Sequence, residues 1–313
     1  MDTKYQKLTP KLALQLANPP SWVAAEFPAA FGIVLSYATG HMLPIWKAVA
    51  LFACCILMQS AVNTMNDYFD YKKGTDTLDD ALEVEDAVFL YNHINPSHAL
   101  VLAIAYLAGG AILGVAAAWG TGITPFACGI IGGLAVLFYS GGRTPISYLP
   151  IGEFVSGFVM GGLIPLAIVS IAAKKAQPVV LICSIPFIIS IGLIMMTNNC
   201  CDIEKDIRAG RKTLPVALGR EKARKVYKNL VLVWKYSIWV LPILIVGPYG
   251  IVAAILLHFA AKDQFNFLCN SPLTQENRIN QMRGIIGANR KANTVYIAII
   301  AVRAIEVLLY RFQ

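Results

Sequence analysis

Nine stretches of mainly apolar residues recur along this chain of 313 residues. An α-helix of about 20 apolar residues can cross the hydrocarbon core of a bilayer, and in lipid a helix satisfies its own backbone polar groups. The stretches cover residues 21–39, 45–66, 98–119, 122–140, 151–173, 178–199, 226–246, 248–262 and 293–312. Only 14% of the residues are charged, against roughly 25% in soluble domains. The sequence therefore predicts an all-α integral membrane protein with about nine transmembrane helices.

The distribution of positive charge predicts the orientation of these helices. With nine spans, the N-terminus and every second connection lie on one side, and 20 of the 26 lysines and arginines fall there. Such an excess marks the cytoplasmic side, so we expect a multi-pass protein of the cell (cytoplasmic) membrane. The net charge of +8 then reflects contact with the lipid bilayer and does not indicate a nucleic-acid partner. Residues 1–20 are predicted to form a short amphipathic helix at the interface.

Two similar polar motifs lie where apolar stretches end. Residues spaced i, i+3 and i+7 share one face of a helix, and each motif places amide and carboxylate side chains at this spacing or directly beside it. The members are Asn63, Asn66, Asp67 and Asp70 in the first motif, and Asn198, Asn199, Asp202 and Asp206 in the second. Mg²⁺ is usually held by one or two carboxylates together with substrate phosphates. The two motifs therefore predict a magnesium site that binds a phosphate ester.

Basic residues accompany both motifs. Lys205, Arg208, Arg211 and Lys212 are interleaved with the carboxylates of the second motif, and Lys72 and Lys73 follow the first. Lysine and arginine donate charge-assisted hydrogen bonds to phosphate oxygens. Two plainer interpretations remain open, namely that the motifs are solvated helix ends and that the basic residues anchor the chain to anionic lipid. Carboxylates at the border of a span are costly, however, and this favours a functional role.

Three segments carry a resemblance to a known family. They are Asn66-Asp67-Tyr-Phe-Asp70-Tyr-Lys-Lys-Gly74-Thr-Asp76, Asn198-Asn199-Cys-Cys-Asp202-Ile-Glu-Lys-Asp206-Ile-Arg-Ala-Gly210-Arg-Lys-Thr213-Leu-Pro-Val-Ala-Leu-Gly219 and Tyr139-Ser-Gly-Gly-Arg143-Thr-Pro-Ile-Ser-Tyr148-Leu-Pro-Ile-Gly152-Glu153. The first two resemble the aspartate motifs of the UbiA superfamily of intramembrane aromatic prenyltransferases. The third is similar to the segment between spans four and five in the 1,4-dihydroxy-2-naphthoate polyprenyltransferase (MenA-like) branch. Many relatives carry an aspartate where this chain has Gly74, and here Asp76 follows two residues later.

The resemblance implies a fold and an activity. The fold is a helical bundle that encloses one central cavity, as a single domain over residues 1–313 with cytoplasmic active-site loops at 67–97 and 200–225. The activity is the Mg²⁺-dependent transfer of a polyprenyl group from a polyprenyl diphosphate to an aromatic acceptor. In the MenA-like branch the acceptor is a dihydroxynaphthoate on the route to menaquinone.

The resemblance also implies roles for individual residues. The metal ligands would be Asn66, Asp70, Asp76, Asn198, Asn199, Asp202 and Asp206. The catalytic residues would be Asp67, Asp70, Asp202, Asp206 and Glu153. The substrate-binding residues would be Asn63, Lys72, Lys73, Tyr139, Arg143, Lys205, Arg208, Arg211 and Lys212. Within these sets, Arg143 would hold the acceptor carboxylate or act only as a positive anchor, and Glu153 would accept a phenolic proton or pair with Arg143.

Two other functions stay open at this point. The first is a UbiA-type enzyme with another acceptor, such as 4-hydroxybenzoate, haem, chlorophyllide or a lipid phosphate. The second is a transporter for divalent cations or organic anions, because acidic residues at span ends also mark ion paths. A transporter is expected to place its acids near the middle of the membrane. Here the acids and bases gather at one end of the predicted spans, and this favours the enzyme.

Overall fold

The computed structural model describes residues 5–74, 88–247 and 249–311, and its secondary structure there is helical apart from one isolated β-bridge between Gln6 and Ile94. The helices are α1 Pro10–Ala17, α2 Val23–Ala38, α3 Ile45–Lys73, α4 Val88–Asn92, α5 Pro96–Ala118, α6 Thr124–Ser140, α7 Gly152–Ser156, η4 Gly157–Leu163, α8 Ile164–Ala173, α9 Val180–Cys183, α10 Ile185–Cys201, α11 Ile203–Arg208, α12 Leu214–Leu218, α13 Arg220–Val246, α14 Tyr249–Cys269 and α15 Arg278–Arg311, with short 3₁₀ turns η1 Pro19–Trp22, η3 Ile146–Tyr148 and η5 Gln275–Asn277.

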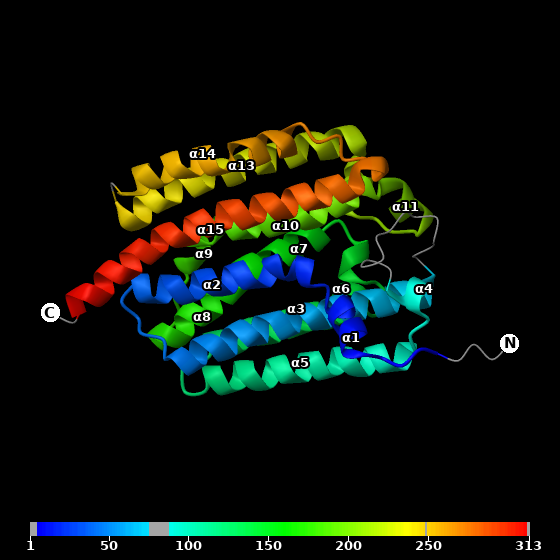
Figure 1. The fold of residues 1–313 in the computed structure, drawn as a ribbon, viewed down its shortest axis with the longest axis horizontal. Helices are drawn as coiled ribbons and strands as arrows, with labels where there is room; N and C mark the ends of the chain where they lie inside the picture. The colour runs from blue at the N-terminus through cyan, green and yellow to red at the C-terminus, as the bar shows by residue number, and fades with distance from the viewer. Residues whose placement is uncertain (1–4, 75–87, 248, 312–313) are drawn as a thin grey trace.

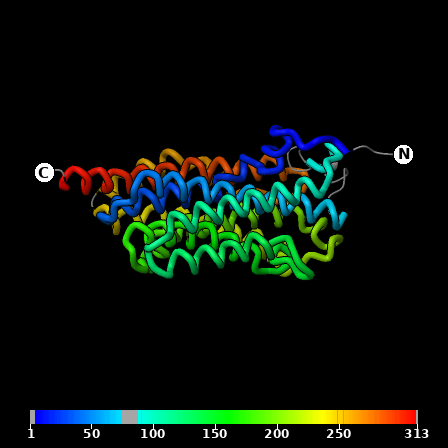
Figure 2. The backbone as a smooth tube through the Cα atoms, turned by 90° about the horizontal axis from the view of Figure 1, so that it is seen from below, coloured from blue at the N-terminus to red at the C-terminus, as the bar shows by residue number. Residues whose placement is uncertain are grey.

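The long helices lie side by side along the longest axis of the molecule (Figures 1 and 2). Among the described residues, seven helices are long and apolar enough to cross a membrane, and α6 and α10 are shorter apolar helices of the same kind. This confirms the all-α membrane fold predicted from the sequence. The end of α3 and the short helix α11 lie at the same end of the bundle (Figure 1), which we call the motif end. The last described turn of α15 lies at the opposite end.

Two helices extend further than the apolar stretches predicted. The first is α3, which continues past the predicted span end at 66 as far as Lys73, so that Asp67 and Asp70 are helical. It ends at Gly74, whose φ of 64° lies in the left-handed region that glycine adopts without strain. The second is α15, which begins at Arg278, fifteen residues before the predicted start at 293. A segment predicted as a connection is therefore part of a helix.

The second motif is interrupted by a bend. Helix α10 ends at Cys201, and Asp202 follows with φ −101° and ψ 18°, outside the helical geometry. The chain then forms α11, and Gly210 ends this helix with φ 70°. The motif does not lie on one straight helix, so the predicted common face of Asn199, Asp202 and Asp206 is wrong in detail. The Asp206 amide still donates to the Asp202 carbonyl at 2.8 Å, and the Asp206 side chain faces Arg211, with Oδ1 3.8 Å from NH1.

Close packing of η4 against α10 fixes the wall next to the second motif. A Cβ atom added at Gly157 would lie 2.3 Å from the Ile188 carbonyl oxygen, and one at Gly161 would lie 2.4 Å from the Ile188 nitrogen. Only glycine permits these approaches, which follow the small-xxx-small pattern of membrane helix pairs. The π-helical turn Gly157–Leu163 is also a form that is frequent near functional sites.

The predicted N-terminal helix is present as α1, which is packed against the bundle. Leu12 and Leu16 are buried in a cluster with Val88, Phe89 and Ile94, and the Thr9 hydroxyl accepts a hydrogen bond from the Leu12 amide as an N-cap. Helix α1 thus lies across the motif end of α3 and α5 (Figure 1). Asp76, a predicted metal ligand, lies outside the described residues.

Candidate active site

A cavity of about 960 Å³ runs between the helices. It is lined by side chains from α2, α3, α5, α6, α7, η4, α8, α10 and α15, and along most of its length these are apolar or small. Polar and charged lining residues gather at the motif end. Among them are Asn63, Asn66, Asp67, Asp70, Tyr139, Asn198, Asn199, Asp202, Lys205, Arg211 and Arg278. Gln59 of α3 and Arg283 and Arg290 of α15 also line the cavity. The two motifs, separated by about 130 residues of sequence, therefore meet at one end of a mainly apolar space.

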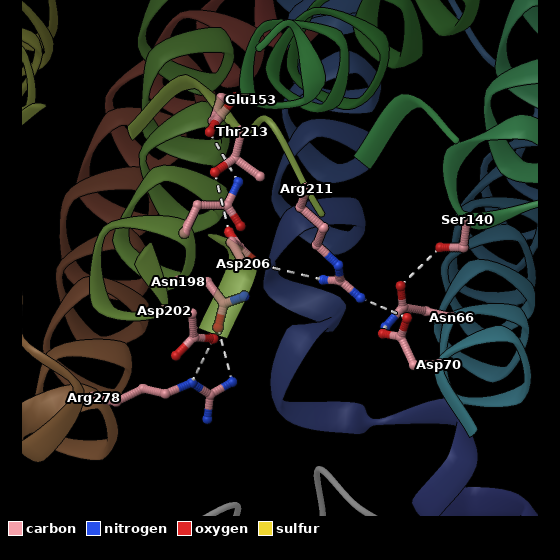
Figure 3. Close-up of polar contacts among 11 residues, drawn as sticks. Asn66, Asp70, Ser140, Glu153, Asn198, Asp202, Asp206, Arg211, Thr213 and Arg278 are labelled. Atoms are coloured by element: carbon pink, nitrogen blue, oxygen red, sulfur yellow. Dashed lines mark hydrogen bonds and ion pairs between the residues drawn. The ribbon is translucent and has the colours of Figure 1, made fainter. Parts of the chain in front are cut away.

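Helix α3 provides one wall of this polar end. Asn66 Nδ2 donates to Asp70 Oδ2 at 3.2 Å, one helical turn away, and Asn66 Oδ1 accepts from the Ser140 hydroxyl at 2.7 Å. Asp70 is buried, with 6% of its surface exposed. Its other oxygen accepts from Arg211 NH2 at 2.6 Å (Figure 3). The amide of Asn66 is thereby held in place from α6, and the carboxylate of Asp70 faces the second motif.

Arg211 crosses from the second motif to the first. Its guanidinium lies between Asp70 and Asp206, whose Oδ1 is 3.8 Å from NH1, and it stacks over the Tyr148 ring at 4.8 Å. The Nε atom of Arg211 is buried and makes no hydrogen bond with the described residues. Burial works to lower the pKa of Arg211, but the carboxylates of Asp70 and Asp206 outweigh it and raise that pKa. Arg211 therefore stays charged and keeps one donor available for a ligand.

Arg278 makes the matching contact on the other wall. Its Nε lies 3.3 Å from Asp202 Oδ2, and its NH2 donates to Asn198 Oδ1 at 2.8 Å. Each predicted metal carboxylate at the cavity thus has an arginine beside it, Asp70 with Arg211 and Asp202 with Arg278 (Figure 3). Sequence reasoning did not identify Arg278, because it placed the residue in a connection. The signal available was its spacing of four and eight residues from Met282 and Ile286 on one helical face.

The buried carboxylates of the second motif have raised pKa values. Burial raises the pKa of Asp202, although Arg278 and Lys205 oppose the rise. Burial raises the pKa of Asp206 to about 6, against the opposing effects of Arg211 and of the hydrogen bond from Thr213. Both carboxylates therefore lie in surroundings that would stabilise further positive charge.

Asp206 lies behind the cavity wall and is not among its lining residues. Only 2% of its surface is exposed, and its Oδ2 accepts from the Thr213 hydroxyl at 3.0 Å. Its other oxygen faces Arg211, whose backbone amide also donates to the Asp206 carbonyl at 2.8 Å. This geometry supports a role for Asp206 in holding Arg211, and the metal ligation predicted for Asp206 stays a prediction.

Glu153 and Asn199 contact each other across two helices. Asn199 Nδ2 donates to Glu153 Oε1 at 2.8 Å, and Glu153 Oε2 is buried without a partner in the described residues. Asn199 lines the cavity and Glu153 does not. Glu153 does not pair with Arg143, which is exposed and lies away from the cavity wall. Both sequence-based roles for Arg143 and Glu153 as substrate contacts stay predictions.

The remaining predicted residues divide into two groups. Lys205 and Tyr139 line the cavity, and Asn63 does so while its amide is engaged in the protein: Nδ2 donates to the Ala17 carbonyl at 2.8 Å and to the Ser21 hydroxyl at 2.7 Å. The exposed residues Lys72, Lys73, Arg208 and Lys212 are not among the lining residues. Lys73 instead donates to the Ser140 carbonyl at 3.1 Å and lies over the Tyr148 ring.

Arg220, at the start of α13, links the second motif to the segment just before Arg278. Its NH2 donates to Glu204 of the second motif at 2.7 Å, and its NH1 donates to the carbonyls of Cys200 at 3.3 Å and Leu273 at 2.5 Å. The Arg220 guanidinium lowers the pKa of Glu204 and keeps it ionised. Leu273 lies shortly before α15, so one side chain ties the end of α10 to the entry of the helix that carries Arg278.

Comparison with known proteins identifies the family. A sequence profile of the UbiA prenyltransferase family matches residues 26–269, which is most of the chain and includes both aspartate motifs. The chain belongs to the UbiA prenyltransferase family. It is a membrane enzyme with many helices, and the resemblance noted in its motifs is confirmed.

Individual members of the UbiA family give the degree of similarity. The 1,4-dihydroxy-2-naphthoate octaprenyltransferase of Bacillus subtilis is 32% identical over 239 residues, which are 74% of this chain and 73% of the relative. The UbiA prenyltransferase domain-containing protein 1 of Danio rerio is 23% identical over 282 residues, 86% of this chain and 80% of the relative.

A solved UbiA homologue shares the fold of this chain. The structure from Archaeoglobus fulgidus bound to GPP and Mg²⁺ has a TM-score of 0.61 at 18% identity, and the match covers 94% of this chain and 99% of that one. At this identity the likeness concerns the fold. It places this UbiA family member in the bundle architecture already described.

Proposed function

We propose that this UbiA enzyme transfers a polyprenyl group from a polyprenyl diphosphate to an aromatic acceptor, 1,4-dihydroxy-2-naphthoate, in a step toward menaquinone. One observation carries the proposal: carboxylates, amides and arginines from two distant motifs converge on one end of a long, mainly apolar cavity. Such a space suits a ligand with a charged head and an apolar tail. The naphthoate acceptor is supported by the 32% identity to an octaprenyltransferase for that compound.

Magnesium fits the oxygen donors at the polar end. Among the described residues, no three or more His, Cys, Asp and Glu side chains gather closely enough to hold a metal alone. Instead, Asn66 is hydrogen-bonded to Asp70 in one carboxylate–amide pair, and Asp202 and Asn198 form another by sharing Arg278. Mg²⁺ commonly takes one or two carboxylates and completes its coordination with substrate phosphates, so two such pairs suit it. When bound, Mg²⁺ would neutralise the negative charge that develops on the leaving diphosphate.

The side chains of this chain would bind the diphosphate and orient it. Arg211 and Arg278 would exchange their contacts with Asp70 and Asp202 for phosphate oxygens, since guanidinium groups bind phosphate strongly. Lys205, buried at the cavity wall, would add a third positive charge. Fixed charges of this kind stabilise the separation of charge in the transition state. The apolar walls would exclude water, which protects the allylic cation from hydrolysis.

The bond changes are those of an electrophilic substitution. The allylic carbon–oxygen bond breaks and its electron pair leaves with the diphosphate, and the ring carbon that bears the carboxylate then forms the new carbon–carbon bond. The ring recovers its aromaticity by releasing the carboxylate as carbon dioxide. The Tyr139 ring lines the same end of the cavity, and an aromatic face there would stabilise the cation.

A direct assay tests this function. Purified enzyme in nanodiscs is incubated with Mg²⁺, a labelled octaprenyl diphosphate and a panel of acceptors that includes 1,4-dihydroxy-2-naphthoate and 4-hydroxybenzoate. We expect a prenylated naphthoate product that disappears with EDTA. If only 4-hydroxybenzoate is prenylated, the acceptor is 4-hydroxybenzoate and not the naphthoate. If no acceptor is prenylated and Mg²⁺ flows into vesicles that contain the protein, the proposed transferase function is wrong and the protein is a transporter.

The orientation in the membrane is part of the proposal. The sequence predicts that 20 of the 26 lysines and arginines lie on the side of the motifs, and such an excess supports a cytoplasmic location for this end. The substrate-binding end would then open toward the cytoplasmic face of the cell membrane. Labelling of a single cysteine introduced at Lys212, which is exposed at the motif end, with a membrane-impermeant reagent in spheroplasts tests it. Labelling only after lysis is expected.

Helix α6 provides room for the prenyl tail. Gly132 lines the cavity, and a Cβ added there would meet no atom within 4 Å. It lies eight residues from Ser140, so about 12 Å deeper than the polar end. We expect Gly132→Phe to lower octaprenyl transfer by at least about tenfold while geranyl transfer stays within about threefold, because the added ring fills the space of the distal tail.

A neighbouring glycine provides the control for this prediction. Gly133 also has open space at its Cβ position but is not among the cavity-lining residues. The Gly133→Phe variant is expected to transfer both donors like the unmodified enzyme. Competition between the two donors, measured by chromatography of the products, checks this. If Gly132→Phe lowers octaprenyl and geranyl transfer equally, this region does not hold the distal part of the prenyl tail.

The raised pKa of Asp206 predicts a pH effect on donor binding. Its pKa of about 6 means that the carboxylate loses its charge as the pH falls through 6 and then holds Arg211 less well. We expect the KM for prenyl diphosphate to rise between pH 7 and pH 5. In Asp206→Asn the KM should already be high at pH 7 and should rise less, because only the titration of the diphosphate remains. Parallel profiles for the two enzymes would exclude Asp206 as the titrating group.

A further inference from the structure

Gln59 presents an unsatisfied acceptor at the cavity, one helical turn before Asn63 of the first motif. It lies on the same face of α3 as Asn63 and lines the cavity. Its Nε2 donates to the Ser21 hydroxyl at 3.3 Å and to Asn63 Oδ1 at 3.1 Å. Its Oε1 is buried and has no partner among the described residues. Since buried polar atoms are nearly always paired, this oxygen is suited to accept a hydrogen bond from a ligand.

Arg290 is exposed, but it lines the same cavity and brings a positive charge to it. It follows Arg278, Met282 and Ile286 on the cavity-lining face of α15, and twelve residues separate it from Arg278, about 18 Å along the helix. A diphosphate held at Arg278 therefore does not extend to it. No described residue forms a hydrogen bond or ion pair with Arg290. Charged residues within membrane helices usually face a cavity and mark a functional site. One turn before it, a Cβ added at Gly287 would meet nothing within 4 Å, so the cavity is open there.

The two residues lie at a similar depth in the bundle. Helix α2 packs between α3 and α15 (Figure 1), and its Phe31 stacks on Tyr296 of α15 at 5.4 Å. Helices α2 and α15 both run away from the motif end. Ser21, which contacts Gln59, lies ten residues before Phe31, and Arg290 lies six residues before Tyr296. The depths of Ser21 and Arg290 along the bundle therefore differ by roughly 6 Å, about one helical turn.

We infer that Gln59 and Arg290 form a second polar subsite that binds the aromatic acceptor, with the Gln59 amide oxygen accepting from a ring hydroxyl and the Arg290 guanidinium binding the ring carboxylate. This inference rests on the proposed function, because that function supplies an acceptor that carries both groups. Guanidinium binds carboxylate through paired hydrogen bonds. Arg143, the sequence-based candidate for the carboxylate, is not among the residues that line the cavity, whereas Arg290 is.

Equilibrium binding to three naphthalenes tests the subsite without requiring turnover. The ligands are 1-hydroxy-2-naphthoate, 2-naphthoate and 1-naphthol, followed by their own fluorescence with the full chain in phosphatidylcholine nanodiscs. In Arg290→Gln we expect the affinity for both carboxylates to fall about 10- to 100-fold and that for 1-naphthol to stay within about twofold. In Gln59→Leu we expect the two hydroxyl compounds to bind about 3- to 10-fold more weakly and 2-naphthoate to be unaffected.

Lys291 provides the matched control. It is the next residue on α15, is exposed, and is not among the cavity-lining residues, so Lys291→Gln should bind all three compounds like the unmodified protein. Retained binding of 1-naphthol shows that the Arg290 variant is folded. The subsite is overturned if Arg290→Gln weakens no ligand or weakens all three equally, or if Lys291→Gln has the same effect.

The test also distinguishes an acceptor carboxylate from a lipid phosphate as the ligand of Arg290, and it distinguishes failure of the subsite from failure of the proposed function. If Arg290 binds a lipid phosphate, Arg290→Gln will change the affinity for the naphthalene carboxylates only in nanodiscs that contain phosphatidylglycerol and not in those of phosphatidylcholine alone. This result overturns the subsite. If the transfer assay yields no product while the carboxylate-specific loss is observed, the proposed function fails and the subsite stands.

Discussion

Asp70→Asn will lower the rate of prenyl transfer by at least about a hundredfold. The substitution keeps the shape of the side chain but removes the one carboxylate of the first motif that both lines the cavity and faces Arg211, at 2.6 Å. A metal held there would lose a charged protein ligand, and electrostatic contributions of this kind are commonly worth several kcal/mol. Steady-state rates at saturating donor and acceptor, measured over a range of Mg²⁺ concentrations, give the result.

The same chemical change elsewhere controls for damage to the fold. Asp263 is exposed on α14, which supplies no lining residue among those described, and Asp263→Asn should leave the rate within about twofold. Asp202→Asn, on the opposite wall, should reproduce the loss of Asp70→Asn. A rate within threefold of the unmodified enzyme in both motif variants would exclude these carboxylates from catalysis.

Arg211→Gln will have opposite effects on the two ligands of the proposed site. Without the guanidinium, prenyl diphosphate should bind about 10- to 100-fold more weakly, because a charged donor to phosphate is lost. In the absence of diphosphate, Mg²⁺ should bind a few-fold more tightly, because Arg211 no longer occupies Asp70. Titration calorimetry with each ligand alone distinguishes the two effects.

Lys212 is the natural control for Arg211. It is adjacent in the chain and carries the same charge, but it is exposed and outside the cavity wall. Lys212→Gln should change neither affinity by more than about twofold. Equal effects of the two substitutions would mean that the general positive charge of the segment binds the donor, and not the contact seen between Arg211 and Asp70.

The apolar spans could be predicted from sequence because they are local patterns, and the meeting of the two motifs because both carry the same ligand types at span ends on the same predicted side. Runs of apolar residues identify membrane helices, and the spacing of Asn66 and Asp70 places them on one face. The boundaries of α3 and α15 could not be predicted in the same way. Both helices continue into polar sequence, where tertiary packing and not hydrophobicity decides whether the helix persists.

The partners of the site residues depended on the same missing information. Arg278 was hidden because its helix begins in a segment rich in arginine, asparagine and glutamine. Helix α10 ends just before Asp202, and Asp206 does not line the cavity although Asp202 and Lys205 do; no residue pattern signals this. The contact of Asn199 with Glu153 follows from the close approach of η4 to α10, for which Gly157 and Gly161 are a readable sign.

Arg220 has a consequence for any attempt to alter the enzyme by exchange of segments. Its guanidinium joins Glu204, the carbonyl of Cys200 and the carbonyl of Leu273, so three stretches that are separate in the gene share one anchor. A chimera that takes the second aspartate motif from a relative, without the matching arginine and the turn before α15, would contain the ligand residues but would hold them in different positions. Exchange units for this protein should therefore be chosen by shared anchors and not by motif boundaries.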